Sequence, residues 1–435
     1  MYDICAYLSY RMDSSLFIAK RLIKKSSSGF TSIIIRIATA TVALGLVVML
    51  CANSVINGFQ NEISNKIFGF WGHIHINDSK ITRSFESIPI SKDQALVDSI
   101  SNIGQLELFD DRTGKSISTA GGVKHVQSYA FCPGVLNSKR VFEGIILKGI
   151  ANDSDDSRLQ QFLKSGELIS LNDSTESRQL IISDQTARRM EVELNDRLII
   201  NFAKDRKVLK KQFTIAGIYK TGLEEYDKKF AFCDMKVVQD VLGWDQDQIT
   251  GYEVFLDDIN DAPIMSDVIY NEYLPTGLYS ETIQQKRPNI FEWLDLLNIN
   301  ERIIIMLMIL VSIINMATVI LIFILDRSHM IGVLKSVGYK NWPVRKVFLY
   351  QAINILLRGI IYGNIIAFIL LIVQRYGEVI KLDEASYYLS VAPVSFSLWQ
   401  VILINIIVIT VTSVSMILPT YIITKIKPIK VLEFV

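Results

Sequence analysis

The chain has 435 residues, half of them apolar, and a formal net charge of +1 at pH 7. Its mean hydropathy of +0.31 is too high for an ordinary soluble protein and too low for a chain buried wholly in lipid. The basic clusters are short and lie beside apolar runs, which argues against a nucleic-acid-binding protein. The composition therefore indicates a membrane protein with a substantial domain outside the bilayer.

The N-terminal part of the chain contains an amphipathic segment and then a long apolar run. In residues 1–32, apolar side chains such as Phe17 are interleaved with lysines and arginines, which predicts a segment on the cytoplasmic membrane surface. The first span is expected at 33–57, and its residues 33–56 are apolar apart from Arg36, Asn53 and small hydroxyl side chains. This run is longer than the apolar part of a secretory signal and lacks a small-residue cleavage site, so we expect a retained span.

Residues 58–300 carry the patterns of a globular domain and no further span. Runs of alternating apolar residues predict strands, and runs with helical periodicity predict helices. The expected strands are 179–182, 197–202, 212–218 and 252–256, and the expected helices are 92–101, 184–192 and 235–242. We expect an α+β domain that is long enough to contain two subdomains.

Three more apolar runs follow, and the first carries no charge over the 23 residues from Ile303 to Leu325. At about 1.5 Å per helical residue it reaches about 35 Å, enough to cross a hydrocarbon core of about 30 Å. The second span is expected at 301–325, the third at 351–374 and the fourth at 398–424, with a polar loop at 375–397 and a tail at 425–435. The predicted fold is a membrane protein with four transmembrane α-helices, arranged 1 + 3, and a large extracytoplasmic α+β domain between the first two.

The segment between the second and third spans, residues 326–350, is rich in basic residues and has one acid. Apolar side chains recur at helical spacing from Met330 to Val337, and Gly338 and Pro343 then interrupt the pattern. This describes a short amphipathic helix with a basic face. From the residues alone two interpretations stay open, an interfacial helix on anionic lipid or a docking helix for a cytoplasmic partner.

The distribution of lysine and arginine predicts the orientation of the spans. The N-terminal segment, residues 326–350 and the tail are rich in these residues, whereas the loop 375–397 is not. We therefore expect both termini on the cytoplasmic side and residues 58–300 on the opposite side of the membrane.

The sequence contains no motif that supports catalysis. The Gly-Lys-Ser tripeptide at 114–116 resembles the end of a phosphate-binding loop, but Phe109 occupies a position that requires glycine. His73 and His75 lie two apart on one face of an expected strand without further metal ligands nearby, so we interpret them as part of a strand surface. We expect no enzyme activity, no cofactor and no metal, so any ATP hydrolysis must belong to a partner.

Two pairs of residues bear on packing. Gly359 and Gly363 form a Gly-x-x-x-Gly motif that allows a close helix contact, in this chain or across a dimer. Cys132 and Cys233 can form a disulfide if their domain lies outside the cytoplasm, and two free thiols are the alternative.

Residues 202–212 connect two expected strands and are strongly basic. The stretch contains Phe202, Lys204, Arg206, Lys207 and Lys210. One interpretation is a solvated hairpin. The other is a protruding basic loop that captures a soluble acidic partner through complementary charge.

Three stretches carry a family resemblance. The first is Phe17-Ile18-Ala19-x-Arg21 with Asn57-Gly58-Phe59 after the first span, the second runs from Asp326 to Gly338, and the third is Leu418-Pro419 with Lys-Pro-Ile-Lys-Val-Leu at 427–432. They resemble the permease subunits of the bacterial lipoprotein-releasing ABC transporter, the LolC/LolE type within the wider MacB/FtsX-like permeases. With the four spans, the resemblance covers essentially the whole chain.

The resemblance implies roles for two segments. In this family the cytoplasmic helix after the second span docks on an ATPase subunit, which favours the docking interpretation of residues 326–350. The residues that match the family's coupling segment are Arg327, Met330, Ile331, Gly332, Leu334, Lys335 and Gly338. The basic stretch that begins at Phe202 matches the loop by which one permease type recruits the periplasmic lipoprotein carrier.

The resemblance also implies a function and a location. It describes a permease of the bacterial inner membrane with a MacB-like periplasmic domain, which uses ATP hydrolysis by a LolD-like ATPase to extract lipoproteins and pass them to a LolA-like carrier for the outer membrane. Further expected partners are a second permease copy or paralogue, the lipoprotein substrates and membrane lipid. The alternatives are an FtsX-like mechanotransmission regulator of a cell-wall hydrolase and a MacB-like efflux permease.

Overall fold

A computed structural model describes residues 15, 17–19, 21, 30–80, 88–110, 115–138, 141–171, 175–204 and 207–425. The chain divides into two compact units. The first comprises Met1–Gln60, Leu294–Lys381 and Val391–Val435, and the second comprises Asn61–Trp293 and Leu382–Ser390. Most of the N-terminal amphipathic segment and the whole 427–432 motif lie outside the described residues.

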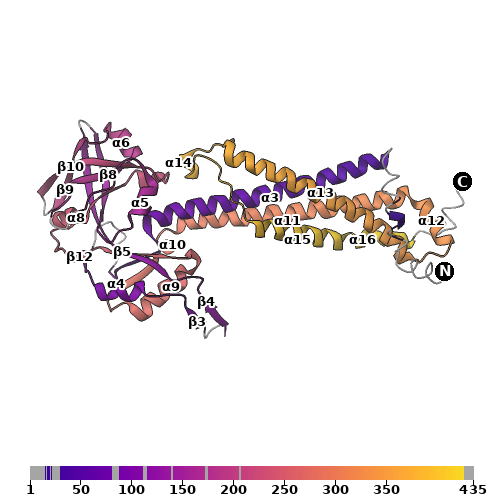
Figure 1. Cartoon of the computed structure of the whole chain (residues 1–435), viewed down its shortest axis with the longest axis horizontal. Helices are drawn as coiled ribbons and strands as arrows, with labels where there is room; N and C mark the ends of the chain where they lie inside the picture. The colour runs from indigo at the N-terminus through magenta and orange to yellow at the C-terminus, as the bar shows by residue number, and fades with distance from the viewer. Residues whose placement is uncertain are drawn as a thin grey trace, which may run out of the picture. The chain divides into compact units, whose positions relative to one another are not determined.

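The first unit is a bundle of long helices that lie side by side (Figure 1). In the described part of the chain, four helices are long and apolar enough to cross a membrane, as predicted. They are α3 (Phe30–Trp71), α11 (Pro288–Asp326), α13 (Asn341–Gly377) and a fourth formed by α15 (Leu398–Ser415), α16 (Ile417–Thr420) and α17 (Ile422–Lys425). A short helix, α12 (Ser328–Ser336), connects α11 to α13. The chain is a multi-pass membrane protein.

The bundle combines an apolar core with a few polar contacts between helices. Side chains such as Leu46, Ile320 and Phe348 are fully buried in this core. On α13, Asn364 Nδ2 donates to Oδ1 of Asn405 on α15 at 2.8 Å, and Asn405 Nδ2 donates back at 3.1 Å. A hydrogen bond of this kind between helices contributes about 1 kcal/mol. The asparagines therefore fasten the third helix to the fourth.

The second unit is built around a ten-stranded sheet with the order β14-β1-β13-β5-β6-β11-β8-β10-β7, in which β9 pairs with both β10 and β5. Its strands are β1 (Ile74–Asp78), β5 (Val123–Ser138), β6 (Val141–Ile150), β7 (Leu163–Gly166), β8 (Gln179–Ser183), β9 (Arg197–Lys204), β10 (Lys207–Tyr219), β11 (Phe230–Asp234), β13 (Gly251–Leu256) and β14 (Leu278–Thr282). Two small ribbons, β2 (Ile90–Ser91) with β12 (Gln248–Ile249) and β3 (Glu107–Asp110) with β4 (Lys115–Ser118), complete the strands.

Short helices flank these strands (Figure 1). They are α4 (Gln94–Ser101), α5 (Asp156–Phe162), α6 (Asp184–Met190), α7 (Glu224–Asp227), α8 (Met235–Leu242), α9 (Ala262–Val268), α10 (Ile283–Lys286) and α14 (Glu384–Tyr387). The four predicted strands correspond to β8, β9, β10 and β13, and the three predicted helices to α4, α6 and α8. The predicted α+β fold of this region is therefore confirmed.

A buried ion pair lies beside the carboxyl end of α3. Lys148 Nζ on β6 donates to Glu253 Oε1 on β13 at 2.7 Å and to the carbonyl oxygen of Phe70 at 2.8 Å. Gln127 Nε2 donates to the second oxygen of Glu253 at 2.8 Å. Burial lowers the pKa of Lys148 and raises that of Glu253, and the attraction between the two charges opposes both shifts. The ion pair therefore anchors the last turn of α3 to the sheet.

His75 is fully buried, so the interpretation of the two histidines as a strand surface is wrong for this residue. Its Nε2–H donates to the carbonyl of Trp71 at 2.7 Å, and its Nδ1 accepts from Lys286 at 3.2 Å. His73 precedes β1, and its Nδ1 accepts from the N–H of Leu256 at 2.8 Å. Because a carbonyl oxygen at a helix end needs a donor, the strand that follows α3 turns a histidine inward to supply one.

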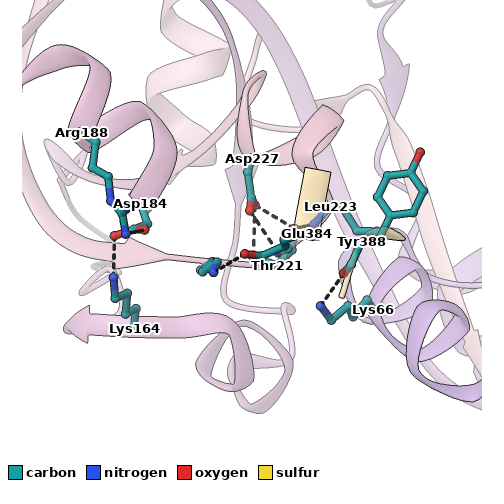
Figure 2. A network of polar contacts seen from close by, with 11 residues as sticks. Lys66, Lys164, Asp184, Arg188, Thr221, Leu223, Asp227, Glu384 and Tyr388 are labelled. Atoms are coloured by element: carbon teal, nitrogen blue, oxygen red, sulfur yellow. Dashed lines mark hydrogen bonds and ion pairs between the residues drawn. The ribbon is translucent and has the colours of Figure 1, made fainter. Parts of the chain in front are cut away.

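The segment between the third and fourth spans contributes α14 to the second unit. Lys66 Nζ, on the last part of α3, donates to the carbonyl of Tyr388 at 3.1 Å, and Lys220 pairs with Glu384 at 2.7 Å. Figure 2 shows Lys66 directed at Tyr388 and the carboxylate of Asp227 directed at Thr221. These contacts fasten residues 382–390 to the rest of the second unit.

The two cysteines whose pairing the sequence left undecided are free thiols. Cys132 and Cys233 are both buried in the second unit, and neither forms a disulfide. Burial raises the pKa of the Cys132 thiol to about 12. These two residues act as small apolar side chains of the core.

Candidate functional site

Helix α12 is the first candidate site, and local sequence sets its C-terminal end. Gly338 adopts a positive φ of 94° just beyond the helix, and its N–H donates to the carbonyl of Lys335 at 3.0 Å. The N–H of Tyr339 donates to the carbonyl of Leu334 at 3.0 Å, which completes a glycine-terminated helix end. Pro343 then lies in the first turn of α13, where a missing N–H costs nothing.

One face of α12 packs against the bundle. Ile331 and Gly332 are buried, and Met330 and Leu334 pack against the apolar core of the first unit. Arg327, just before the helix, pairs with Asp326 at 3.2 Å. Most of the residues that match the family's coupling segment therefore position α12 and do not face outward.

The opposite face of α12 is exposed and partly apolar. His329, Val333 and Val337 follow one another at intervals of four residues, and all three are exposed. Val333 is 41% exposed and Val337 is 77% exposed, and Trp342 at the start of α13 is also exposed. The sequence prediction missed this face because it assigned the outward side to the basic residues.

Two of those basic residues point inward and bind the end of the fourth span. Arg345 Nε donates to Thr420 Oγ1 at 3.0 Å, and its terminal nitrogen donates to the carbonyl of Ile417 at 3.3 Å. The guanidinium also lies 4.0 Å from the ring centre of Tyr421. Lys335 Nζ donates to the carbonyl of Ile423 at 2.5 Å, and burial lowers the pKa of Lys335.

A hydrogen-bond defect in the fourth span explains why Arg345 turns inward. The N–H of Tyr421 donates to the carbonyl of Leu418, so the Ile417 carbonyl lacks its usual helical donor. Arg345 and Thr420 supply donors instead. As a result, α12, the first turns of α13 and the end of the fourth span form one connected elbow.

The elbow has no chemistry of its own that we can assign. Across the residues that the structure describes, no group of three or more histidine, cysteine, aspartate or glutamate side chains is arranged to hold a metal ion. Gly114 of the 114–116 tripeptide lies outside the described residues, and so does the side chain of Lys115. What the elbow presents is an exposed apolar face between two membrane spans, which is suited to a protein contact.

The basic stretch that begins at Phe202 is the second candidate site. Most of it forms the paired ends of strands β9 and β10, and not a loop. Lys204 pairs with Lys207 in the β9–β10 hairpin, and Arg206 lies outside the described residues. Phe202 is buried in the core, because the alternation of β9 turns it inward. Lys207 and Lys210 are exposed.

Beside this hairpin, the outer face of the sheet is uncovered and partly apolar. Asn137 on β5 pairs with Phe142 on β6 and with Ile199 on β9, which places the three side chains in one row on the same face. Phe142 is 69% exposed and Val208 on β10 is 64% exposed. A side chain added at Gly144 would meet open space. The alternation of apolar and polar residues in β9 could have indicated which of its side chains point outward, but the strands β5 and β6 were not predicted from the sequence.

The Gly-x-x-x-Gly motif lies against α3 of the same chain. A Cβ atom at Gly359 would come within 2.7 Å of a methyl carbon of Val42, and one at Gly363 within 2.9 Å of the carbonyl oxygen of Ala43. Both glycines therefore permit close packing between the first and third spans.

Comparison with known proteins adds an independent observation. Residues 302–428 match the family model described as "FtsX-like permease C-terminal". The chain is 23% identical over 425 residues to the "Lipoprotein-releasing system transmembrane protein LolC" of Xylella fastidiosa (strain Temecula1 / ATCC 700964), with 94% of this chain and 96% of that protein covered. It is 19% identical over 368 residues to the corresponding LolE protein of Haemophilus influenzae, with 82% of each chain covered.

The chain is also similar to solved structures. One of them is the extracellular domain of the noncanonic ABC-type transporter YknZ from Gram-positive bacteria, with 13% identity and a TM-score of 0.31. The alignment covers 48% of this chain and 98% of that one.

Proposed function

Because the chain is a LolC/LolE-type permease with an FtsX-like C-terminal region, we propose that it is the membrane subunit that releases lipoproteins from the bacterial inner membrane. The observation that carries the proposal is similarity to LolC along 94% of the chain. The same similarity favours lipoprotein release over the hydrolase regulator and the efflux permease. In this proposal both termini are cytoplasmic and the second unit is periplasmic.

The proposed energy source is a separate LolD-like ATPase that docks on the elbow. The exposed face of His329, Val333 and Val337 supports this role, because an apolar strip outside the membrane spans is suited to a protein partner. Lys335 and Arg345 bind the end of the fourth span, so a displacement of α12 would be transmitted to the third and fourth spans together. A second permease, identical or paralogous, completes the assembly.

The docking face is tested by Val337→Glu in a reconstituted system with the ATPase, a lipoprotein in proteoliposomes and a soluble carrier. Burial of an unpaired carboxylate in an apolar contact costs more than about 1.4 kcal/mol, so ATP-driven release is expected to fall about tenfold or more. The matched control is Val379→Glu, at an exposed valine in the loop 375–397. Release at the wild-type rate by Val337→Glu would remove the elbow from the proposal.

The proposed receiving site for a LolA-like periplasmic carrier is the β9–β10 hairpin with the uncovered face beside it. The exposed Lys207 and Lys210 supply positive charge, and Phe142 and Val208 supply apolar surface. Photo-crosslinking from Val208 to the carrier is expected to weaken in Lys207→Glu/Lys210→Glu and at high salt. Lys124→Glu, an exposed change at the other end of β5, is the control. Equal crosslinking in all variants would contradict this site.

A further inference from the structure

The first unit contains a partly open cavity of about 480 Å³ between α3, α11 and α15. This volume lies within the range of about 300–1,000 Å³ that is usual for small-ligand pockets. Its polar lining residues are Asn53, Asn57, Asn298, Glu301, Arg302 and Gln400. The rest of the lining is apolar and comes from the same three helices.

The polar and apolar lining residues occupy opposite ends of the cavity. On α11 Glu301 precedes Ile305, on α15 Gln400 precedes Leu403, and on α3, which runs in the opposite direction, Met49 precedes Asn53. Hydrogen bonds join the polar ends, from Asn53 Nδ2 to Glu301 Oε1 at 2.6 Å and from Gln400 Nε2 to Asn57 Oδ1 at 3.3 Å. The cavity is therefore amphipathic along the direction of the spans, like a lipid.

The cavity lining carries one charge of each sign, and neither has an ionic partner in the described part of the chain. Glu301 accepts from Asn53, but no basic side chain among the described residues pairs with it. Arg302 is exposed and forms no ion pair with any described residue. Because the two are adjacent on α11, they point in different directions and do not neutralise each other. A basic side chain near the end of a span reaches the headgroup region, where a lipid phosphate is an available partner.

Gln400 adds a second indication that the cavity is suited to a ligand. Its Nε2 is used by Asn57, whereas its Oε1 is buried and finds no donor among the described residues. An unsatisfied buried acceptor costs about as much as a lost hydrogen bond. A ligand that brings N–H groups would satisfy both this oxygen and the carboxylate of Glu301.

We propose that the cavity binds a phospholipid with a primary ammonium headgroup, of the phosphatidylethanolamine type. The ammonium donates to Glu301 and to Gln400 Oε1, the phosphate pairs with Arg302, and the upper part of the acyl chains occupies the apolar end. Leu403 and Ile407 are exposed at that end, which gives the chains a route to the surrounding hydrocarbon. A choline headgroup has the charge but no N–H to donate, and a glycerol headgroup has no positive charge.

The test uses the full-length protein in nanodiscs made from equal amounts of phosphatidylethanolamine, phosphatidylcholine and phosphatidylglycerol. Lipids that stay bound after extraction are counted by native mass spectrometry. The wild type is expected to retain phosphatidylethanolamine in preference to both others. Loss of one charge-assisted hydrogen bond in Glu301→Gln is expected to reduce the preference over phosphatidylcholine about tenfold. Arg302→Gln is expected to weaken retention of all three.

The matched control is Asp295→Asn, which removes an exposed carboxylate of α11 outside the cavity and is expected to change nothing. Equal retention of the three lipids by the wild type would overturn the proposal, and so would an unchanged preference in Glu301→Gln.

A synthetic diacylglyceryl-cysteinyl peptide is added in a further arm. Displacement of phosphatidylethanolamine by this lipopeptide, with the same dependence on Glu301, would assign the cavity to the transported substrate and overturn the proposal. Lipid retention is measured on the isolated protein, so its failure is distinguishable from a failure of lipoprotein release.

Discussion

In the second unit Lys148 donates to the carbonyl of Phe70 near the end of α3, and in the first unit Arg345 donates to the carbonyl of Ile417 near the end of the fourth span. Both are buried basic side chains that complete the backbone hydrogen bonds of a helix end. Their surroundings differ. Lys148 has the buried Glu253 as counter-ion, whereas Arg345 has no acidic partner among the described residues and stacks on Tyr421.

We call the contact of Lys148 with Glu253 and Phe70 the sealed joint, and the contact of Arg345 with Ile417, Thr420 and Tyr421 the adaptable joint. A buried ion pair is stable only in one close geometry, because separating its charges in a low-dielectric core is expensive. A guanidinium that stacks on a ring and donates to neutral oxygens can shift at smaller cost. We infer that the last turn of α3 is held rigidly within the second unit, and that the elbow around α12, in the first unit, is able to move.

The largest expected effect comes from breaking the sealed joint. Lys148→Met leaves Glu253 buried without its partner and should destabilise the second unit by about 3–5 kcal/mol. Hydrogen exchange of β13 in the full-length protein measures this loss. Lys148→Met/Glu253→Leu should recover most of it, and Lys164→Met, which removes an exposed pair with Asp184, should cost less than about 1 kcal/mol. A loss below 1 kcal/mol in the first variant would contradict a sealed joint.

The stability of the second unit should also depend on pH in the acidic range. Burial, reinforced by the charge of Arg158, lowers the pKa of His73 to about 4, and its Nδ1 accepts from Leu256, so the folded state requires the neutral form. Stability from this group is fully present above pH 6.5 and is lost as the pH falls through about 4, up to about 3 kcal/mol.

The same hydrogen-exchange measurement across this pH range tests the sign. His73→Gln keeps an acceptor for Leu256 but cannot titrate, so the loss on acidification should shrink. His329→Gln, on the exposed face of α12, should leave it unchanged. A stability that rises as the pH falls would show that His73 is not the group responsible.

A smaller effect is expected where the spans meet through glycine. A Cβ at Gly363 would approach the backbone oxygen of Ala43, which cannot rotate away, so Gly363→Ala should destabilise the bundle by about 1–3 kcal/mol. Thermal unfolding in detergent measures this change. Gly377→Ala is the control, because its added Cβ would meet only an ordinary contact at 3.6 Å. Equal stability of the two variants would mean that the first and third spans are not held this closely.

The smallest effect is expected at the adaptable joint. Arg345→Lys keeps the charge but loses the stacking on Tyr421, which should cost about 0.5–2 kcal/mol. ATP-driven release should fall more than stability, because α12 loses its tie to the fourth span. Release unchanged while stability falls would remove Arg345 from coupling.

The spans and several strands were predictable because local sequence determines them. Twenty-three residues without a charge have few alternatives to a membrane helix, and the alternation in β8, β9, β10 and β13 is visible residue by residue. Gly338 also marked the end of α12 correctly, since its positive φ is a local requirement.

The inward side chains were not predictable in the same way. His75, Phe202, Lys335 and Arg345 turn inward because a helix end, a strand face or an irregular span lies next to them, and only the tertiary fold brings those partners close. A pattern of basic residues predicts a basic face only when no unpaired carbonyl lies nearby. The exposed face of Val333 and Val337 was missed for the same reason, because the basic side chains turn inward and the apolar ones stay outside.

The most direct test of the central claim is the distribution of lipoproteins between the inner and outer membranes after this protein is depleted. Lipoprotein release predicts that outer-membrane lipoproteins accumulate in the inner membrane before growth stops. Wild-type protein should reverse the accumulation, and Val337→Glu should not. An unchanged distribution after depletion would contradict the account.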